Sequence, residues 1–134
     1  MKPREVREAA AEVIRRCEDA ARLIEEFCAR VRRGDDEGGA AFCREREEIL
    51  GAIAALGATA EPDPSDPETA ERHRADRARA IRRILELDRE LIGLLEARKA
   101  GVRAEMEDLR RGRRSLGSYR GPVAASPAFV DRLG

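Results

Sequence analysis

The sequence predicts an all-α protein, and three features of composition and patterning indicate this class. Charged residues make up 40% of the 134 residues, aromatic residues make up only 3%, and tryptophan is absent. Apolar residues recur at alternating steps of three and four over long stretches, which is the period of helices that pack against one another. No stretch shows the strict alternation of a half-buried strand. We therefore expect an elongated antiparallel bundle of three helices with a long third helix and a short C-terminal tail.

The first predicted helix begins near Pro3, because proline suits the first turn of a helix. Its apolar residues form one stripe without a charge. It should end at the segment VRRGDDEGG, where arginines favour a helix C-terminus and glycines interrupt the helix. The stripe consists of Val6, Ala10, Val13, Cys17, Ala20, Ile24, Phe27 and Val31.

The second predicted helix begins after the pair Asp35–Asp36 and ends at Gly57. The segment EPDPSDP follows, and its three prolines predict a stiff loop. A charged residue interrupts the apolar stripe of this helix. The stripe consists of Phe42, Arg46, Ile49, Ile53 and Leu56.

The third predicted helix begins at Pro67, with Asp66 as its N-cap, and meets no decisive break before Gly117. Its start, ETAERHRADRARA, is almost entirely polar, and its apolar stripe runs from Ile81 to Leu109. At about 1.5 Å per residue, this stripe is about as long as that of the first helix. We therefore expect the two stripes to pack together, with the shorter second helix covering one end.

An acidic residue lies inside the apolar stripe of the third helix. On a helix, Asp88 falls near the middle of the surface formed by Ile84, Leu91, Ile92 and Leu95. A carboxylate is costly on such a surface unless another group pairs with it.

Three interpretations of Asp88 stay open. If the second and third helices are antiparallel, Arg46 falls within about a turn of Asp88, and an interhelical ion pair would fix their register. Alternatively, Asp88 lies at a wet edge of a thin bundle, or it receives a basic residue of a partner protein.

The sequence predicts no catalytic site, no metal site and no cofactor. His73 is the only histidine, and its polar surroundings predict a solvated helix face rather than catalysis. No glycine-rich phosphate loop is present. The cysteines Cys17, Cys28 and Cys43 have no metal-ligand spacing, so we expect reduced thiols in packed helices.

Charge and hydropathy limit the classes of partner that the protein could bind. The 27 basic and 27 acidic residues balance, so no overall field favours nucleic acid. The basic cluster Arg110–Arg114 is interpreted as a solvated helix end, with contact to an acidic protein surface as the alternative. No apolar run is long enough to span a membrane, which predicts a cytoplasmic protein. We expect residues 1–117 to form the bundle and residues 118–134 the tail.

One flank of the third helix should stay open near its C-terminal half, because the second helix is too short to cover it. Gly93 and Gly101 in this helix are either tolerated surface glycines or points of close approach by another helix. Phe129 and Val130 in the tail, with Tyr119, are expected to cover part of the flank when no partner is bound. The predicted partner-binding residues are Ile92, Leu95, Val102, Met106, Leu109 and Tyr119.

The segment ILELDRELIGLLEARKAGVRAEMEDLRRGRRSLGSY, followed by PAFVDRLG, resembles the C-terminal part of FliT-type flagellar export chaperones, with FlgN-type chaperones as close relatives. The shared features are an acid-bearing leucine stretch, a basic turn, a glycine and basic run, a tyrosine and a short ending. The resemblance covers residues 81–134, and the first 80 residues share only helical character.

The resemblance implies a cytoplasmic, non-enzymatic, all-helical chaperone. Such proteins hold the disordered terminal segment of a late flagellar export substrate, a filament cap or hook-associated protein, in an apolar groove and deliver it to the export ATPase complex. In some members a C-terminal helix folds back over this surface, whereas the tail here is short and broken by proline. The alternatives are a coiled-coil adaptor that forms a homodimer through the same stripe, and a helical protein that binds nucleic acid through Arg110–Arg114.

Overall fold

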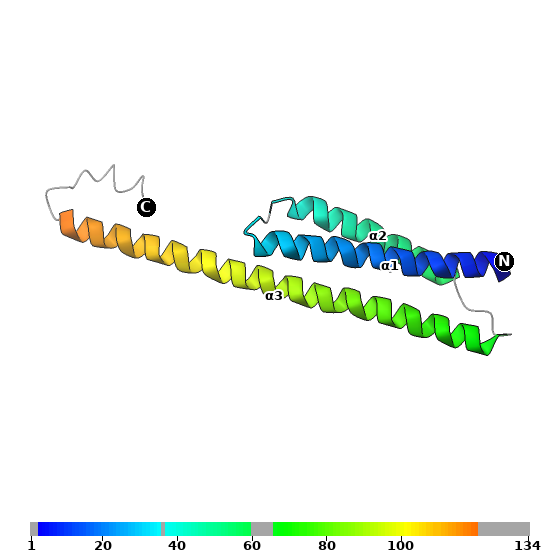
Figure 1. Cartoon of the computed structure of the whole chain (residues 1–134). Helices are drawn as coiled ribbons and strands as arrows, with labels where there is room; N and C mark the ends of the chain where they lie inside the picture. The colour runs from blue at the N-terminus through cyan, green and yellow to red at the C-terminus, as the bar shows by residue number, and fades with distance from the viewer. Residues whose placement is uncertain (1–2, 36, 60–65, 121–134) are drawn as a thin grey trace. The chain divides into compact units, whose positions relative to one another are not determined.

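The protein is all-α in the part of the chain that the structure describes. The computed structural model describes three ranges of the backbone: residues 3–35, 37–59 and 66–120. Three helices lie in these ranges (Figure 1): α1 (Pro3–Arg32), α2 (Gly39–Thr59) and α3 (Pro67–Arg120). The predicted class, with three helices of which the third is the longest, is confirmed.

The chain divides into two compact units. The first, Met1–Leu95, contains α1, α2 and the N-terminal part of α3, and it holds the hydrophobic core. The second, Glu96–Gly134, contains the rest of α3. The predicted boundary between bundle and tail at residue 117 stays a prediction, because residues 121–134 lie outside the described ranges.

The predicted stripe of α1 forms the centre of the core in the first unit. Seven of its eight side chains are buried, and Val6 at its start is half-buried. An uncharged stripe of this length can leave water only by packing against other apolar surfaces, which α2 and α3 supply. The seven buried residues are Ala10, Val13, Cys17, Ala20, Ile24, Phe27 and Val31.

The turn between α1 and α2 is a C-terminal capping motif that needs glycine. The N–H of Asp35 donates to the carbonyl of Arg30, and the N–H of Gly34 donates to that of Val31, each at 2.9 Å. This Schellman pattern requires a left-handed residue after the helix, and Gly34 has φ of 80°. Gly38 has φ of 81°, so a second glycine turns the chain into α2.

Aromatic stacking holds α1 and α2 together beside this turn. The rings of Phe27 and Phe42 stack with centroids 4.3 Å apart and an interplanar angle of 7°. The Arg30 guanidinium lies 5.7 Å from the centroid of Phe27, a cation–π geometry. The helix α2 begins at Gly39 and ends at Thr59, so Gly57 lies inside it rather than ending it.

The start of α3 is capped as predicted, but its extent differs. The Asp66 carboxylate accepts hydrogen bonds from the Thr69 N–H at 3.3 Å and from the Thr69 hydroxyl at 2.7 Å, which satisfies an orphan donor of the first turn. The helix then continues past Gly117 to Arg120. A single glycine costs about 1 kcal/mol relative to alanine, which weakens a helix without ending it.

Charge pairs connect α1 with α3 in the first unit. Arg83 pairs with Glu25, and Glu90 pairs with Arg32. Both pairs have the same offset along the two helices, so α1 and α3 run parallel. With side chains about half exposed, these pairs set orientation more than they add stability.

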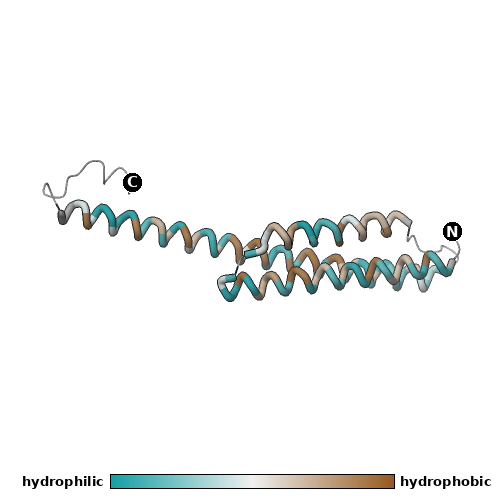
Figure 2. The backbone as a smooth tube through the Cα atoms, turned by 90° about the horizontal axis from the view of Figure 1, so that it is seen from above, coloured by the Kyte–Doolittle hydropathy of each residue, from teal (hydrophilic) through white to brown (hydrophobic). Residues whose placement is uncertain are grey.

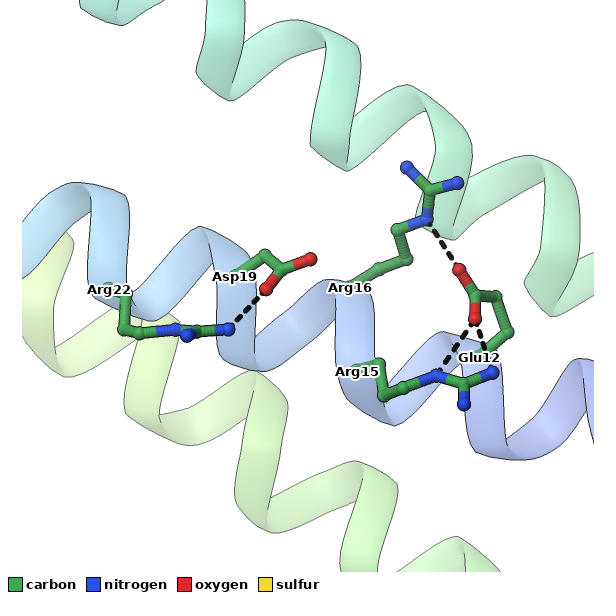
Figure 3. A network of polar contacts seen from close by, with 5 residues as sticks. All are labelled: Glu12, Arg15, Arg16, Asp19 and Arg22. Carbon is green, nitrogen blue, oxygen red and sulfur yellow. Dashed lines mark hydrogen bonds and ion pairs between the residues drawn. The ribbon is translucent and has the colours of Figure 1, made fainter.

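A network of charged side chains runs along α1 (Figure 3). The Glu12 carboxylate accepts hydrogen bonds from the Nε atoms of Arg15 and Arg16, each at 2.9 Å. Hydrogen bonding by Arg15 lowers the pKa of Glu12 below its ordinary value. Asp19 pairs with Arg22 one turn further along. These pairs follow the helical spacing of three and four residues, at which side chains on a helix surface are neighbours.

The prediction that the α3 stripe packs along α1 as far as Leu109 is wrong. Within α3 the side chains that belong to the core end at Leu94, and every described side chain from Glu96 to Gly117 is exposed. The polar start of α3 packs instead, with Ala70 only 3% exposed. His73, which was expected on a solvated face, is half-buried, and its Nε2 has no partner among the described residues.

Candidate partner-binding surface

The helix α3 carries two apolar stripes side by side in the first unit. One faces the core, and its residues are buried or half-buried. The other is displaced by one residue, or about 100° around the helix, and is exposed. The core-facing stripe consists of Ala80, Ile84, Leu87, Leu91 and Leu94. The exposed stripe consists of Ile81, Leu85, Ile92 and Leu95, which we term the first patch.

The same spacing of three and four continues along α3 in the second unit. Val102, Met106, Leu109 and Leu116, which we term the second patch, are between 44% and 64% exposed. Figure 2 shows hydrophobic residues recurring among hydrophilic ones along the helix. The term exposed stripe denotes the positions of both patches in the sequence of α3, and each patch is described within its own unit.

The exposed stripe is a candidate site because it is regular as well as apolar. Isolated exposed leucines are ordinary on protein surfaces, but contiguous apolar patches mark places where proteins meet partners. The eight side chains occupy eight of the eleven successive stripe positions from Ile81 to Leu116. The pattern is that of the α1 stripe, which is buried, so the exposed stripe has the form of an interface without a described partner.

The remaining three stripe positions are charged: Asp88, Lys99 and Arg113. The Asp88 carboxylate accepts two hydrogen bonds from Arg46 of α2, from Nη2 at 2.5 Å and from Nε at 3.2 Å. Only 18% of the Asp88 side chain and 31% of the Arg46 side chain are exposed. Donating hydrogen bonds to the Asp88 carboxylate raises the pKa of Arg46 above its ordinary value. The first of the three interpretations of Asp88, an interhelical ion pair, is therefore the geometry found.

A second contact, between Gly57 of α2 and Arg77 of α3, shows that these two helices run antiparallel. A Cβ atom at Gly57 of α2 would lie 2.6 Å from Nη2 of Arg77 of α3. Glycine therefore leaves room for the arginine to lie across α2. Going from Arg46 to Gly57 along α2, the contact on α3 moves back from Asp88 to Arg77, as it must between antiparallel helices.

The structure places five of the six predicted partner-binding residues at the surface. Their exposed fractions range from 40% to 64%. The side chain of Tyr119 lies outside the described residues, as do Phe129 and Val130. The five exposed residues are Ile92, Leu95, Val102, Met106 and Leu109.

Sequence reasoning missed Ile81, Leu85 and Leu116 as parts of the surface. The step from Leu109 through Arg113 to Leu116 continues the same spacing, but the predicted apolar stripe was ended at Leu109. Ile81 was taken as the start of a packed stripe and Leu85 was not assigned, because periodicity cannot distinguish two adjacent stripes on one helix.

The other candidate features have structural explanations. Cβ atoms at Gly93 and Gly101 would meet nothing within 4 Å, as for surface glycines. All three thiols are free; Cys17 and Cys28 are buried, which raises their pKa, whereas Cys43 is exposed rather than packed. Within the described ranges, no group of three or more metal-ligating side chains comes together. None of the helices in those ranges has the length and apolar content of a membrane span.

A regular exposed apolar stripe, such as α3 carries in the described part of the chain, is typical of proteins that bind other proteins. The chain matches the family described as flagellar protein FliT over residues 9–121, and it therefore belongs to the FliT family, a family of flagellar chaperones. The match reaches well into the first 80 residues, which sequence inspection had likened to the family only in being helical. No curated protein and no solved structure matches the chain.

Proposed function

We propose that this protein is a cytoplasmic flagellar export chaperone that binds the terminal segment of a filament cap or hook-associated protein on its exposed stripe. The observation that supports the proposal most directly is the stripe itself, with eight large apolar side chains at helical spacing. An amphipathic helix with apolar residues at the same spacing would bury these side chains and release their bound water. Membership of a flagellar chaperone family supports the same role.

Holding a substrate in this way requires contacts rather than chemistry. The stripe contains a methionine, whose flexible side chain adapts to different partner surfaces. Its rim is rich in charges of both signs, which suits a polar boundary around an apolar centre. We infer that the protein is not an enzyme, and that delivery to the export ATPase complex uses surfaces other than this stripe.

The test is capture of purified flagellar cap and hook-associated proteins by wild-type protein and by a Val102→Asp/Met106→Asp variant. Two carboxylates in the stripe would have to be buried without partners, so capture should be lost. The matched control is Ala97→Asp/Ala104→Asp, which adds the same charges to exposed positions on the opposite face of α3. If both variants capture the substrates as well as wild type does, with helicity intact, the stripe is not the binding site.

The alternative function is that of a coiled-coil adaptor without a substrate. The regular spacing of the exposed stripe supports it, since the same pattern pairs helices in coiled coils. Failure of every flagellar export substrate to bind wild-type protein would favour this alternative. A nucleic-acid role through Arg110–Arg114, which are exposed, would instead show as binding that weakens steeply with salt.

A further inference from the structure

Asp88 lies at the centre of the first patch. Ile81 and Leu95 are each seven residues from it along α3. Leu85 precedes it by three residues, and Ile92 follows it by four. At these spacings the four apolar side chains share one face of the helix with Asp88, and they are between 38% and 56% exposed. A partner that covers the first patch must therefore also cover this carboxylate. All five residues belong to the first unit.

The ion pair with Arg46 leaves the Asp88 carboxylate able to accept further hydrogen bonds. Arg46 donates one hydrogen bond to each of the two oxygens, from Nε and from Nη2. A carboxylate has about four acceptor sites, so each oxygen can accept a second donor. The side chain is still 18% exposed. An apolar group placed over it would remove the remaining hydration without replacing it, which is costly.

The charges around the ion pair favour a positive group over a negative one at this point. Hydrogen bonding to Asp88 raises the pKa of Arg46, and the nearby charge of Glu47 raises it further. Glu47 is itself exposed. Two carboxylates and one guanidinium leave this point with a net negative charge. A third carboxylate would be repelled there, whereas a second guanidinium would be attracted and could donate hydrogen bonds to Asp88.

The edge of the first patch that lies away from the core carries the opposite charge. Arg82 and Arg89 follow Ile81 and Asp88 by one residue, so they lie about 100° further around α3. Both arginines are exposed. Acidic residues along one flank of a partner helix would be attracted to this edge, which orients the helix and speeds its association.

We propose that the first patch binds an amphipathic helix of the export substrate that carries one arginine at the centre of its apolar stripe and acidic residues along one flank. Its apolar residues lie about one and two turns from the arginine on either side, which matches the spacing around Asp88. Arginine suits this position better than lysine, because its planar guanidinium binds a carboxylate through two parallel hydrogen bonds and is more weakly hydrated. That the helix comes from an export substrate rests on the proposed function, whereas its chemistry rests on the patch.

The first experiment exchanges the two charges of the ion pair. In Arg46→Asp/Asp88→Arg the pair between α2 and α3 forms in the reverse direction, and the centre of the patch becomes positive. The probes are two synthetic amphipathic peptides with the same apolar stripe and acidic flank, which differ only in a central arginine or glutamate. Calorimetric titration should show that wild type binds the arginine peptide about tenfold or more tightly than the glutamate peptide, and that the exchanged variant reverses this order.

The matched control for the exchange is Asp19→Arg/Arg22→Asp. It exchanges an exposed pair on α1 and should keep the preference of wild type for the arginine peptide. Asp88→Asn removes the central charge without changing the shape of the side chain. It should lose the preference, and it decides the test if the exchanged variant loses helicity by circular dichroism. Equal binding of the two peptides by wild type, or binding of neither, would overturn the inference.

The second experiment separates this inference from the chaperone role. Purified flagellar cap and hook-associated proteins are captured by wild type, and each arginine of the bound terminal segment is changed to leucine in turn. One of these changes should weaken capture by about tenfold or more. Capture that is unaffected by every such change and by Arg46→Asp/Asp88→Arg would overturn the inference and leave the chaperone proposal standing. Failure to capture any of these proteins, with the peptide preference intact, would overturn the chaperone proposal and support the chemistry of the patch.

Discussion

The N-terminal and C-terminal parts of α3 are helical for different reasons. Up to Leu94 the helix contributes side chains to a shared core, with Ile84, Leu87 and Leu91 at 6% exposure or less. From Glu96 to Gly117 every described side chain is exposed. An isolated helix of this length is marginal in water, because its stability comes from intrinsic propensity alone. The comparison teaches that one unbroken helix contains both a part packed into a shared core and a part whose described side chains are all exposed.

The most direct test of this difference is to make the same leucine-to-alanine substitution in both parts of α3. Leu87→Ala should lower the free energy of unfolding by about 2–5 kcal/mol, because Leu87 is 2% exposed and its removal leaves a cavity. Leu109→Ala, at 64% exposure, should change it by about 0.5 kcal/mol or less. Urea unfolding followed by circular dichroism, at a concentration where the protein is monomeric, measures both. Equal losses would show that Leu109 is packed.

The contrast explains which features could be predicted from the sequence. The stripe of α1 has no charge and no competing stripe, so spacing alone identified its buried face. The start of α3 could also be predicted, because Asp66 is a preferred N-cap residue and Pro67 is favoured at the first helical position. The sequence did not predict which face of α3 is buried against the core. Its two stripes differ by one residue, and only the position of α1 and α2 decides which is covered.

The prediction that the polar start of α3 lies in solvent was wrong for a related reason. Ala70 is small, and His73 and Arg77 are polar, so hydropathy assigns this stretch to solvent. In the structure these residues lie along the line of the core-facing stripe, at steps of three and four before Ala80. Small and amphipathic side chains can line an interface without any apolar signal in the sequence. The exposed positions Val102, Met106 and Leu109 in the second unit were predictable because no second stripe competes with theirs, whereas Leu116 was missed.

The ion pair inside the first unit should have the next largest effect. Arg46→Ala and Asp88→Ala should each lower stability by about 2–3 kcal/mol, since each leaves a largely buried charge without its partner. The double variant should lose clearly less than the sum of the two. Chemical denaturation at neutral pH measures the cycle. Strict additivity would mean that the pair has no energetic role in setting the register of α2 and α3.

The buried thiols predict how the stability of the first unit depends on pH. Burial raises the pKa of Cys17 and Cys28 above the ordinary value of a thiol. Their contribution is therefore complete below pH 9 and is lost as the pH rises toward the folded pKa, because only the unfolded thiols ionise in between. Stability should therefore fall as the pH rises from 8 to 10.

The matched variants for this test are Cys17→Ala/Cys28→Ala and Cys43→Ala. The first should have a flatter stability profile between pH 8 and pH 10 than wild type, whereas the second removes an exposed thiol and should leave the profile unchanged. A profile that is equally steep in all three proteins would assign the pH dependence to other groups. These thiols report on the first unit only, because the second unit has no cysteine.

The smallest expected effects are those of glycine-to-alanine substitutions, which should differ between the two parts of α3. Gly93→Ala and Gly101→Ala both add a methyl group where nothing lies within 4 Å, so each should gain up to about 1 kcal/mol of helix propensity. At Gly93 the gain should raise the midpoint of global unfolding, because this turn belongs to the packed unit. At Gly101 it should instead slow amide hydrogen exchange in residues 96–117 and leave the midpoint unchanged, since local opening there does not require the core to unfold. A lower midpoint for Gly101→Ala would show instead that another helix approaches this glycine closely in solution.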